Sequence, residues 1–297
     1  LIPLRESEAI FEQLASSDKD LRLFCEIRAV TSRQLLEKMK SAGVNKLQIG
    51  IEALSTRLLK KLNKGTRTIQ NLEIMKNCEE LGLVNSSNLI MEFPGSDDDD
   101  VAETLRNMEF ALPFRPMRVV QFWLGTGSPV WKVPKAFGIQ TVFNHPNWSR
   151  LFPVDVAKRM DFMIKSYRGD RSVQKKLWRP VKAKVRSWEK MYAELHRDPF
   201  SPPILSYRDG KDFLIIYQRR LQAETMTHRL VGASRNIYLF CRQRRNLKSI
   251  MERFPQFGED RLIPFLNMMV GKKLMFAESH EYLSLAVSLR LRSGSIE

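Results

Sequence analysis

The segment KLQIGIEAL, residues 46–54, decides the fold. It predicts a β-strand, and helical patterns flank it on both sides. Before it, TSRQLLEKMKSAG (residues 31–43) carries an apolar stripe with helical spacing and ends at a glycine. After it, the pattern predicts helices over residues 55–62 and 68–82. This strand is therefore expected to lie in a layered α/β structure.

Three further strands are predicted on either side of this core. They are LRLFCEIR (residues 21–28), VNSSNLIMEFPG (84–95) and RVVQFWL (118–124), and a helix over residues 97–112 opens with four aspartates. The order is β-α-β-α-β-α-β, with connections long enough for right-handed crossovers. We therefore predict parallel strands in an α/β layer or a sector of a barrel, with functional residues at the C-terminal ends of the strands.

The pattern changes twice further along the chain. After residue 125 a Gly/Pro-rich loop leads into residues 150–197, which are expected to be mostly helical. The three prolines of residues 199–206 predict a boundary. Beyond it the sequence predicts two strands around an Asp-Gly turn, a short strand NIYLFCR, two helices and a C-terminal hairpin. The predicted units are residues 1–140, a basic helical extension at 141–200, and a small winged-helix-like α+β module at 201–297.

Charge is unevenly distributed along the chain. The 49 basic and 33 acidic residues give a net charge of +16. Residues 1–145 contribute +1 and residues 146–297 contribute +15. Such a basic half predicts an anionic partner, either an acidic peptide, a nucleic acid or an anionic surface, although a solvated basic face is an equal alternative. The apolar content of 43% excludes disorder as the main state.

The chain is expected to be cytoplasmic and to have no membrane span. No apolar run of about 18 residues occurs, and the charged N-terminus is unlike a signal peptide. The three cysteines Cys25, Cys78 and Cys241 are widely spaced, which fits a reducing compartment and provides neither a disulfide framework nor a metal-binding run. The chain begins with Leu1, so we expect it to be a fragment or a processed product.

Several polar residues follow the predicted strands. Gly50 and Glu52 end the second strand, where glycine permits close approach of a ligand and a carboxylate can bind hydroxyls or an ammonium group. The alternative is that Glu52 caps the next helix. The third strand contains Asn88 and ends in Glu92, and the fourth contains Gln121.

Together these elements resemble the second half of a radical S-adenosylmethionine (SAM) domain. The shared pattern is an E-I-R strand, a G-I-E strand, an L-x-x-L-x-K-G helix end, a strand ending in F-P-G and a strand followed by S-P. The resemblance implies a partial barrel of βα units, of which these would be the third to sixth. It also implies cofactor-binding roles for ten residues: Glu26 on the third strand, Gly50, Ile51 and Glu52 toward the ribose and amino-acid parts of SAM, Asn88, Glu92, Pro94 and Gly95 toward adenine, and Gln121 and Leu124 on the sixth strand.

The downstream sequence narrows the resemblance. NHPNWSRLFP (residues 144–153), the basic stretch and MVGKKLMFAESHEYLSLAV (residues 269–287) look like the cobalamin-dependent radical SAM C-methyltransferases that mature ribosomally made peptides. That resemblance implies SAM, a [4Fe–4S] cluster and cobalamin as cofactors, and a precursor peptide, with an acidic leader, as partner. Its winged-helix-like ending would recognise the peptide.

The chain departs from this pattern in two respects. The C-x-x-x-C-x-x-C cluster loop and the Gly-rich SAM turn would both lie before residue 1, and the cobalamin domain further upstream. Many relatives also have Gly in place of Glu92 and an acidic residue in place of Ser96. We therefore expect a fragment of a peptide C-methyltransferase that is inactive by itself. The alternatives are a radical SAM enzyme that modifies RNA and a non-catalytic peptide-binding protein.

Two further residue types are open to two interpretations. His145, in Asn-His-Pro, is a candidate acid/base or substrate contact, but a turn-stabilising role is favoured. The five tryptophans either line a peptide groove or pack the extension against the barrel.

Overall fold

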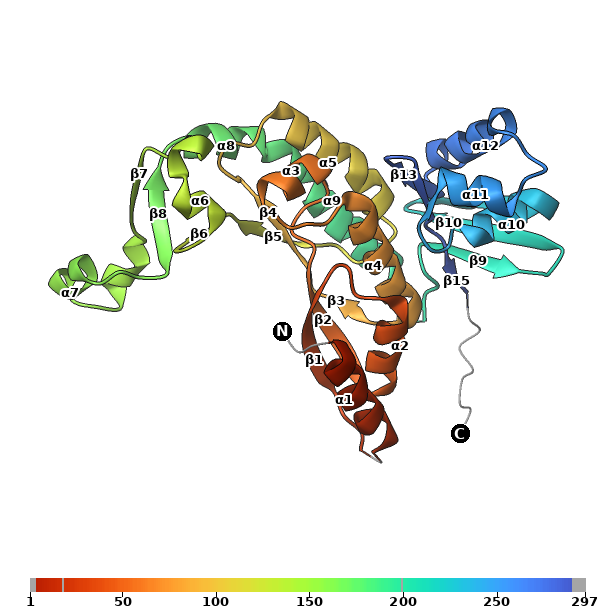
Figure 1. Ribbon diagram of the computed structural model, residues 1–297, viewed down its shortest axis with the longest axis horizontal. Coiled ribbons are helices and arrows are strands. Elements are labelled where there is room, and N and C mark those ends of the chain that lie inside the picture. Colours follow the sequence, from red (N-terminus) through yellow and green to blue (C-terminus); the bar gives the residue numbers. More distant parts are fainter. Residues whose placement is uncertain (1–3, 18, 199, 290–297) are drawn as a thin grey trace.

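The computed structural model describes residues 4–17, 19–198 and 200–289, and its first part alternates strands and helices (Figure 1). The elements of this part are α1 (Leu4–Ser16), β1 (Leu23–Arg28), α2 (Arg33–Ser41), β2 (Val44–Gly50), α3 (Thr56–Lys61), α4 (Thr68–Leu81), β3 (Val84–Asn85), β4 (Asn88–Met91), α5 (Asp98–Ala111) and β5 (Arg118–Gln121). The predicted helices and parallel strands are confirmed, and α1 is an addition that the sequence pattern did not predict.

The parallel strands form a curved, open layer. β1, β2 and β3 pair in parallel, and β4 pairs in parallel with β5. A parallel bridge between Glu52 and Leu89 joins the two sheets, with the Ile90 N–H donating to the Glu52 carbonyl at 2.8 Å. Within the described residues the layer does not close. It is a mixed α/β layer that matches the predicted sector of a radical SAM barrel.

One face of this layer is covered and the other is open. Along β1, Cys25 and Ile27 turn toward α2 and the core, whereas Phe24, Glu26 and Arg28 are exposed. Phe24 is 55% exposed. Since successive side chains of a strand point to opposite faces, the even-numbered residues of β1 mark the concave face on which a ligand would bind.

The predicted strand over residues 84–95 is interrupted, which corrects that prediction. Asn85 Oδ1 accepts from the Ser87 main-chain N–H at 3.0 Å and also from the Ser87 hydroxyl. Such a side-chain turn competes with strand pairing. As a result β3 pairs with the start of β2, and β4 pairs with β5.

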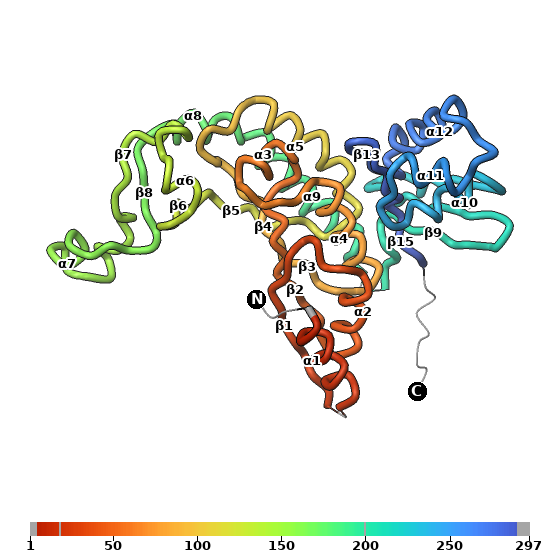
Figure 2. Tube along the Cα trace, viewed as in Figure 1, coloured from red at the N-terminus to blue at the C-terminus, as the bar shows by residue number. Residues whose placement is uncertain are grey.

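The segment after β5 holds a second, antiparallel sheet. Its elements are β6 (Leu124–Gly125), α6 (Pro129–Lys132), η1 (Pro134–Phe137), β7 (Thr141–Asn144), η2 (Pro146–Arg150), α7 (Val154–Arg159), β8 (Ile164–Arg168), α8 (Arg171–Leu177) and α9 (Arg179–Leu195). The strand order is β6-β8-β7, and β7, α7 and β8 extend away from the rest of the chain, whereas α9 returns to pack on α5 (Figure 2). The prediction of a mostly helical segment over 150–197 is therefore wrong at β8, where Lys165, Ser166 and Tyr167 are all buried.

The C-terminal part comprises two small sheets and three helices. Its elements are β9 (Leu205–Asp209), β10 (Phe213–Arg220), β11 (Ala223–Val231), α10 (Gly232–Phe240), β12 (Arg245–Asn246), α11 (Leu247–Arg253), α12 (Glu259–Gly271), β13 (Met275–Glu278), β14 (Glu281–Ser284) and β15 (Val287–Ser288). The sheets have the orders β11-β10-β9-β15 and β12-β14-β13. Three helices with a terminal hairpin that pairs with the short β12 match the predicted winged-helix-like module.

The prediction of a strand at NIYLFCR is wrong. These residues lie in and just after α10, where Ile237, Tyr238 and Cys241 are buried with helical spacing. The Tyr238 hydroxyl donates to the Leu274 carbonyl at 3.0 Å. A short apolar run does not distinguish a buried strand from a buried helix, and here the tertiary contacts select the helix.

Buried polar contacts join α4 to the C-terminal module. The Lys76 ammonium is fully buried and donates to the carbonyls of Arg242 and Ser284. Glu80 accepts from Arg33 on α2 at 2.5 Å and from Arg242 at 2.8 Å. Because these groups come from three elements far apart in sequence, they fix the module against the α/β layer.

Candidate functional site

The end of β2 presents the first candidate group. Glu52 follows β2 with a left-handed backbone, φ 64°, and Lys64 donates to its Oε1 at 3.2 Å. Its side chain is 18% exposed, so the carboxylate is partly shielded but reachable. A Cβ added to Gly50 would meet only the Ile27 carbonyl, at 3.9 Å, which leaves open space above the strand end. Ile51, by contrast, is fully buried in the core.

The end of β4 presents the second candidate group. Glu92 follows β4, also with a left-handed backbone, φ 58°, and Gln121 at the end of β5 donates to its Oε2 at 3.1 Å. Because the Glu52 main chain bridges to β4, the two glutamates end neighbouring strands. A left-handed L-residue costs about 1 kcal/mol. Glycine would take this conformation without that cost.

Two other predicted residues lie on the same layer: Glu26 on β1, and Asn88, which directly precedes Leu89, the bridge partner of Glu52. Glu26 pairs in register with Gln48 and is exposed on the concave face. Asn88 begins β4 beside Arg118, so it lies at the opposite end of that strand from Glu92.

The last three predicted residues, Pro94, Gly95 and Leu124, do not lie with the glutamates at the strand ends. Pro94 is buried, and Leu124 is fully buried in β6, paired with Lys165 of the antiparallel sheet. Gly95 uses both of its main-chain groups within the chain: its N–H donates to Asp170 at 3.1 Å and its carbonyl accepts from Lys61 at 3.1 Å. Gly95 therefore anchors the loop after β4.

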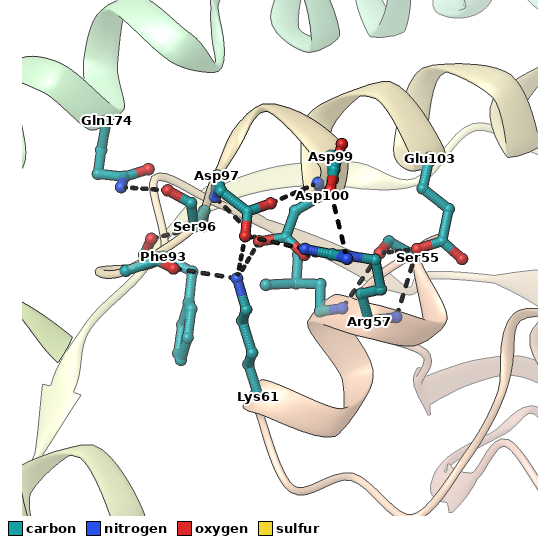
Figure 3. A network of polar contacts seen from close by, with 12 residues as sticks. Ser55, Arg57, Lys61, Phe93, Ser96, Asp97, Asp99, Asp100, Glu103 and Gln174 are labelled. Atoms are coloured by element: carbon teal, nitrogen blue, oxygen red, sulfur yellow. Dashed lines mark hydrogen bonds and ion pairs between the residues drawn. The ribbon is translucent and has the colours of Figure 1, made fainter. Parts of the chain in front are cut away.

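A network of charges fixes this loop (Figure 3). Asp97 caps α5 by accepting from the Asp100 N–H at 3.0 Å, and Arg57 and Lys61 of α3 bind both aspartates. Although burial opposes it, the Asp100 main-chain N–H and the Lys61 ammonium lower the pKa of Asp97 to about 2. The aspartates thus begin the helix, as predicted, and also bind α3 to it. The contacts of Lys61 and Asp170 with Gly95 had no signal in the sequence.

The cysteines do not form a cluster site. Among the described residues no group of three or more His, Cys, Asp or Glu side chains could hold a metal ion. Burial raises the pKa of Cys78 and of Cys241 to about 12, and it also raises the pKa of Cys25. Because iron is bound by thiolates, these thiols do not fit a [4Fe–4S] cluster.

His145 and the tryptophans, each of which had two possible roles, take the following positions in the structure. His145 accepts from the Asn147 N–H at 3.2 Å and so stabilises its turn. Trp178 and Trp188 are core residues, whereas Trp123 is 68% exposed. Trp148 stacks on Phe162 within the antiparallel segment.

Comparison with known families bears directly on the open layer. Residues 3–108 match the family model of the radical SAM superfamily. This part of the chain is similar to that superfamily. The match includes β1, β2, β4 and the glutamates that follow β2 and β4. The matching stretch therefore includes these strands and the concave face that they form.

Individual relatives share a quarter or less of their aligned residues with this chain. An uncharacterised methyltransferase of Pyrococcus horikoshii is 25% identical over 126 residues, which is 41% of this chain and 27% of that protein. Among solved structures, the cobalamin-dependent radical SAM enzyme OxsB is 20% identical over 45% of this chain and 20% of its own, with a TM-score of 0.34. Coproporphyrinogen III oxidase of Escherichia coli is 12% identical over 95% of this chain and 71% of its own, with a TM-score of 0.41. This chain thus spans about a quarter of its curated relative.

Proposed function

We propose that this chain is the SAM-contacting and partner-docking part of a radical SAM methyltransferase that modifies a ribosomally made peptide with the help of cobalamin. One observation carries the SAM assignment. Two carboxylates, Glu52 and Glu92, follow neighbouring strands, and there is open space at Gly50 beside the first of them, within the stretch that matches the radical SAM superfamily. The methyltransferase relative supports the reaction class.

The chemistry of the strand ends fits a bound SAM. Carboxylates accept hydrogen bonds from ribose hydroxyls and from an ammonium group, and SAM carries both. Glu52 is held by Lys64, and Glu92 is held by Gln121, so both acceptors are positioned before a ligand arrives. When bound to a reducing cluster, SAM supplies a carbon radical, and the protein's part is to orient and shield it.

We propose that the iron–sulfur cluster and cobalamin bind elsewhere in the whole enzyme. The three thiols are dispersed and partly or fully buried, so the chain itself does not hold the iron–sulfur cluster.

The partner that we propose is a precursor peptide with an acidic leader. The outer sides of α8 and α9 carry exposed basic residues that no core contact requires: Lys175, Lys176, Arg179, Lys182, Arg186 and Lys190. A row of cations favours an anionic chain by steering and by charge pairing.

No helix within the described ranges is long and apolar enough to cross a membrane.

Two experiments test this proposal. The reading frame upstream of Leu1 should encode C-x-x-x-C-x-x-C, whereas a start codon with a ribosome-binding site at residue 1 would favour a non-catalytic peptide-binding protein. For the partner, binding of an acidic peptide is compared with binding of tRNA at increasing salt. Tight tRNA binding that persists with sequence preference would favour the RNA-modifying alternative.

A further inference from the structure

A cavity of about 930 Å³ lies away from the strand ends described above. The C-terminal end of α4, the C-terminal end of α9, the prolines of residues 201–203 and the last described residues, 288–289, line it. Its walls are largely apolar, with Leu81, Leu83 and Pro203 among them. A cavity of this size and character is typical of a small-molecule site, in which a few polar groups set the orientation.

The polar floor of this cavity is an under-satisfied carboxylate. The Glu79 side chain is 14% exposed, and the nearest side-chain donor is the Tyr192 hydroxyl, at 3.3 Å from Oε2 and 3.5 Å from Oε1. A single hydroxyl donates one hydrogen bond, whereas a carboxylate accepts several. Burial, despite Tyr192 and Arg115, raises the pKa of Glu79 to about 7. The carboxylate therefore accepts from two neutral donors, the Tyr192 hydroxyl and the Arg115 main-chain N–H, and among the described residues it forms no ion pair with a Lys or Arg side chain.

The neighbouring histidine does not supply a further donor. His196 Nδ1 lies 3.0 Å from the Tyr192 carbonyl, which can only accept, so Nδ1 carries the proton. Burial lowers the pKa of His196, which favours the neutral ring. Its Nε2 is then an acceptor, and it lies 3.8 Å from Glu79 Oε1. Two acceptors thus face each other across a gap with no proton donor between them.

We propose that this cavity binds an apolar ligand carrying a protonated amine, with the ammonium group between Glu79 and His196. An ammonium group has three donors, enough for the carboxylate, the imidazole and one further acceptor. Arg115 and Lys40 also line the cavity. Both side chains are exposed, so water screens their repulsion, whereas the attraction of the buried Glu79 is screened much less. The site is independent of the proposed SAM function.

The test titrates n-hexylammonium and, as a neutral control of the same length, 1-hexanol into the full chain by NMR. Hexylammonium should bind at least about tenfold more tightly than hexanol at pH 8. Glu79→Gln should remove this preference, because it deletes the charge without changing the shape. Glu189→Gln, at an exposed position on α9, should leave it unchanged. Equal binding of amine and alcohol by the unmodified protein would overturn the proposal.

The pH dependence gives a second readout that needs no variant. With a pKa of about 7, only about 1% of Glu79 is ionised at pH 5, so hexylammonium binding should weaken about 100-fold between pH 8 and pH 5. Protonation of His196 would add to the loss. The other charged or titratable side chains around the pair are Tyr192, Glu80, Arg115 and Lys40, which line the cavity, and Arg219, which acts on His196. Amine binding that is constant from pH 8 to pH 5 would also overturn the proposal.

Discussion

Replacing Glu80 by glutamine should destabilise the chain far more than its conservative character suggests. The Glu80 side chain is 1% exposed and lies between the guanidinium groups of Arg33 and Arg242. Burial alone would raise its pKa, but Arg242 and Arg33 hold the pKa of Glu80 below its ordinary value. The change removes the buried carboxylate from both guanidinium groups, and Arg33 keeps only its pair with the exposed Glu37.

The expected loss follows from the cost of breaking a buried ion pair, about 3–5 kcal/mol. Urea unfolding monitored by the fluorescence of the buried Trp178 and Trp188 measures it. Because the folded pKa of Glu80 is depressed, its stabilising contribution is present above the ordinary pKa of glutamate and is lost as the pH falls. The difference between the wild type and Glu80→Gln should therefore shrink in acid.

Glu37 provides the matched control. It also pairs with Arg33, at 2.9 Å, but its side chain is 46% exposed. A solvent-exposed pair contributes about 0–1 kcal/mol, so Glu37→Gln should change stability by less than about 1 kcal/mol. If Glu80→Gln costs no more than Glu37→Gln, the inference that these buried contacts hold the C-terminal module is wrong.

Three further outcomes are expected. Glu92→Gly should keep the free energy of unfolding in urea within about 0.5 kcal/mol of the wild type, because relief of the left-handed backbone offsets the added chain entropy. Met91→Gly, in the buried strand, should lower the free energy of unfolding by more than about 2 kcal/mol. Trp188→Phe removes the N–H that donates to the Leu112 and Phe114 carbonyls and should cost about 2 kcal/mol; a loss below 0.5 kcal/mol would show that water replaces it. Reconstitution with iron and sulfide should yield no stoichiometric 4Fe cluster on this chain, and iron analysis with absorption spectroscopy would reveal a contrary result.

Local pattern predicted the α/β part well because its signals agree with one another. The helix over 97–112 has both an aspartate cap and an apolar face, and the structure places α5 there with a capping box at Asp97. The failures lie where the signals conflict or are short. NIYLFCR is apolar without a decisive period, and the Asn85–Ser87 turn divides a strand that hydrophobicity alone makes continuous.

The residues of the candidate site also differ in whether the sequence could place them. Gly50, Glu52 and Glu92 follow strands, so chain order alone places them at one edge of a parallel layer. Leu124 lies only three residues beyond Gln121, yet it enters a different sheet. The Glu79–His196 pair joins residues 117 positions apart, through the packing of α9 on α4, and no local pattern indicates such a contact.

SAM binding tests the central claim most directly. Equilibrium dialysis with radiolabelled SAM compares the wild type with Glu52→Gln and with the control Glu37→Gln. One charged hydrogen bond contributes about 1.5–3 kcal/mol, so Glu52→Gln should raise the dissociation constant about 10- to 100-fold, while Glu37→Gln should leave it unchanged. Equal affinity of the wild type and Glu52→Gln would contradict the assignment of the open strand ends as the SAM site.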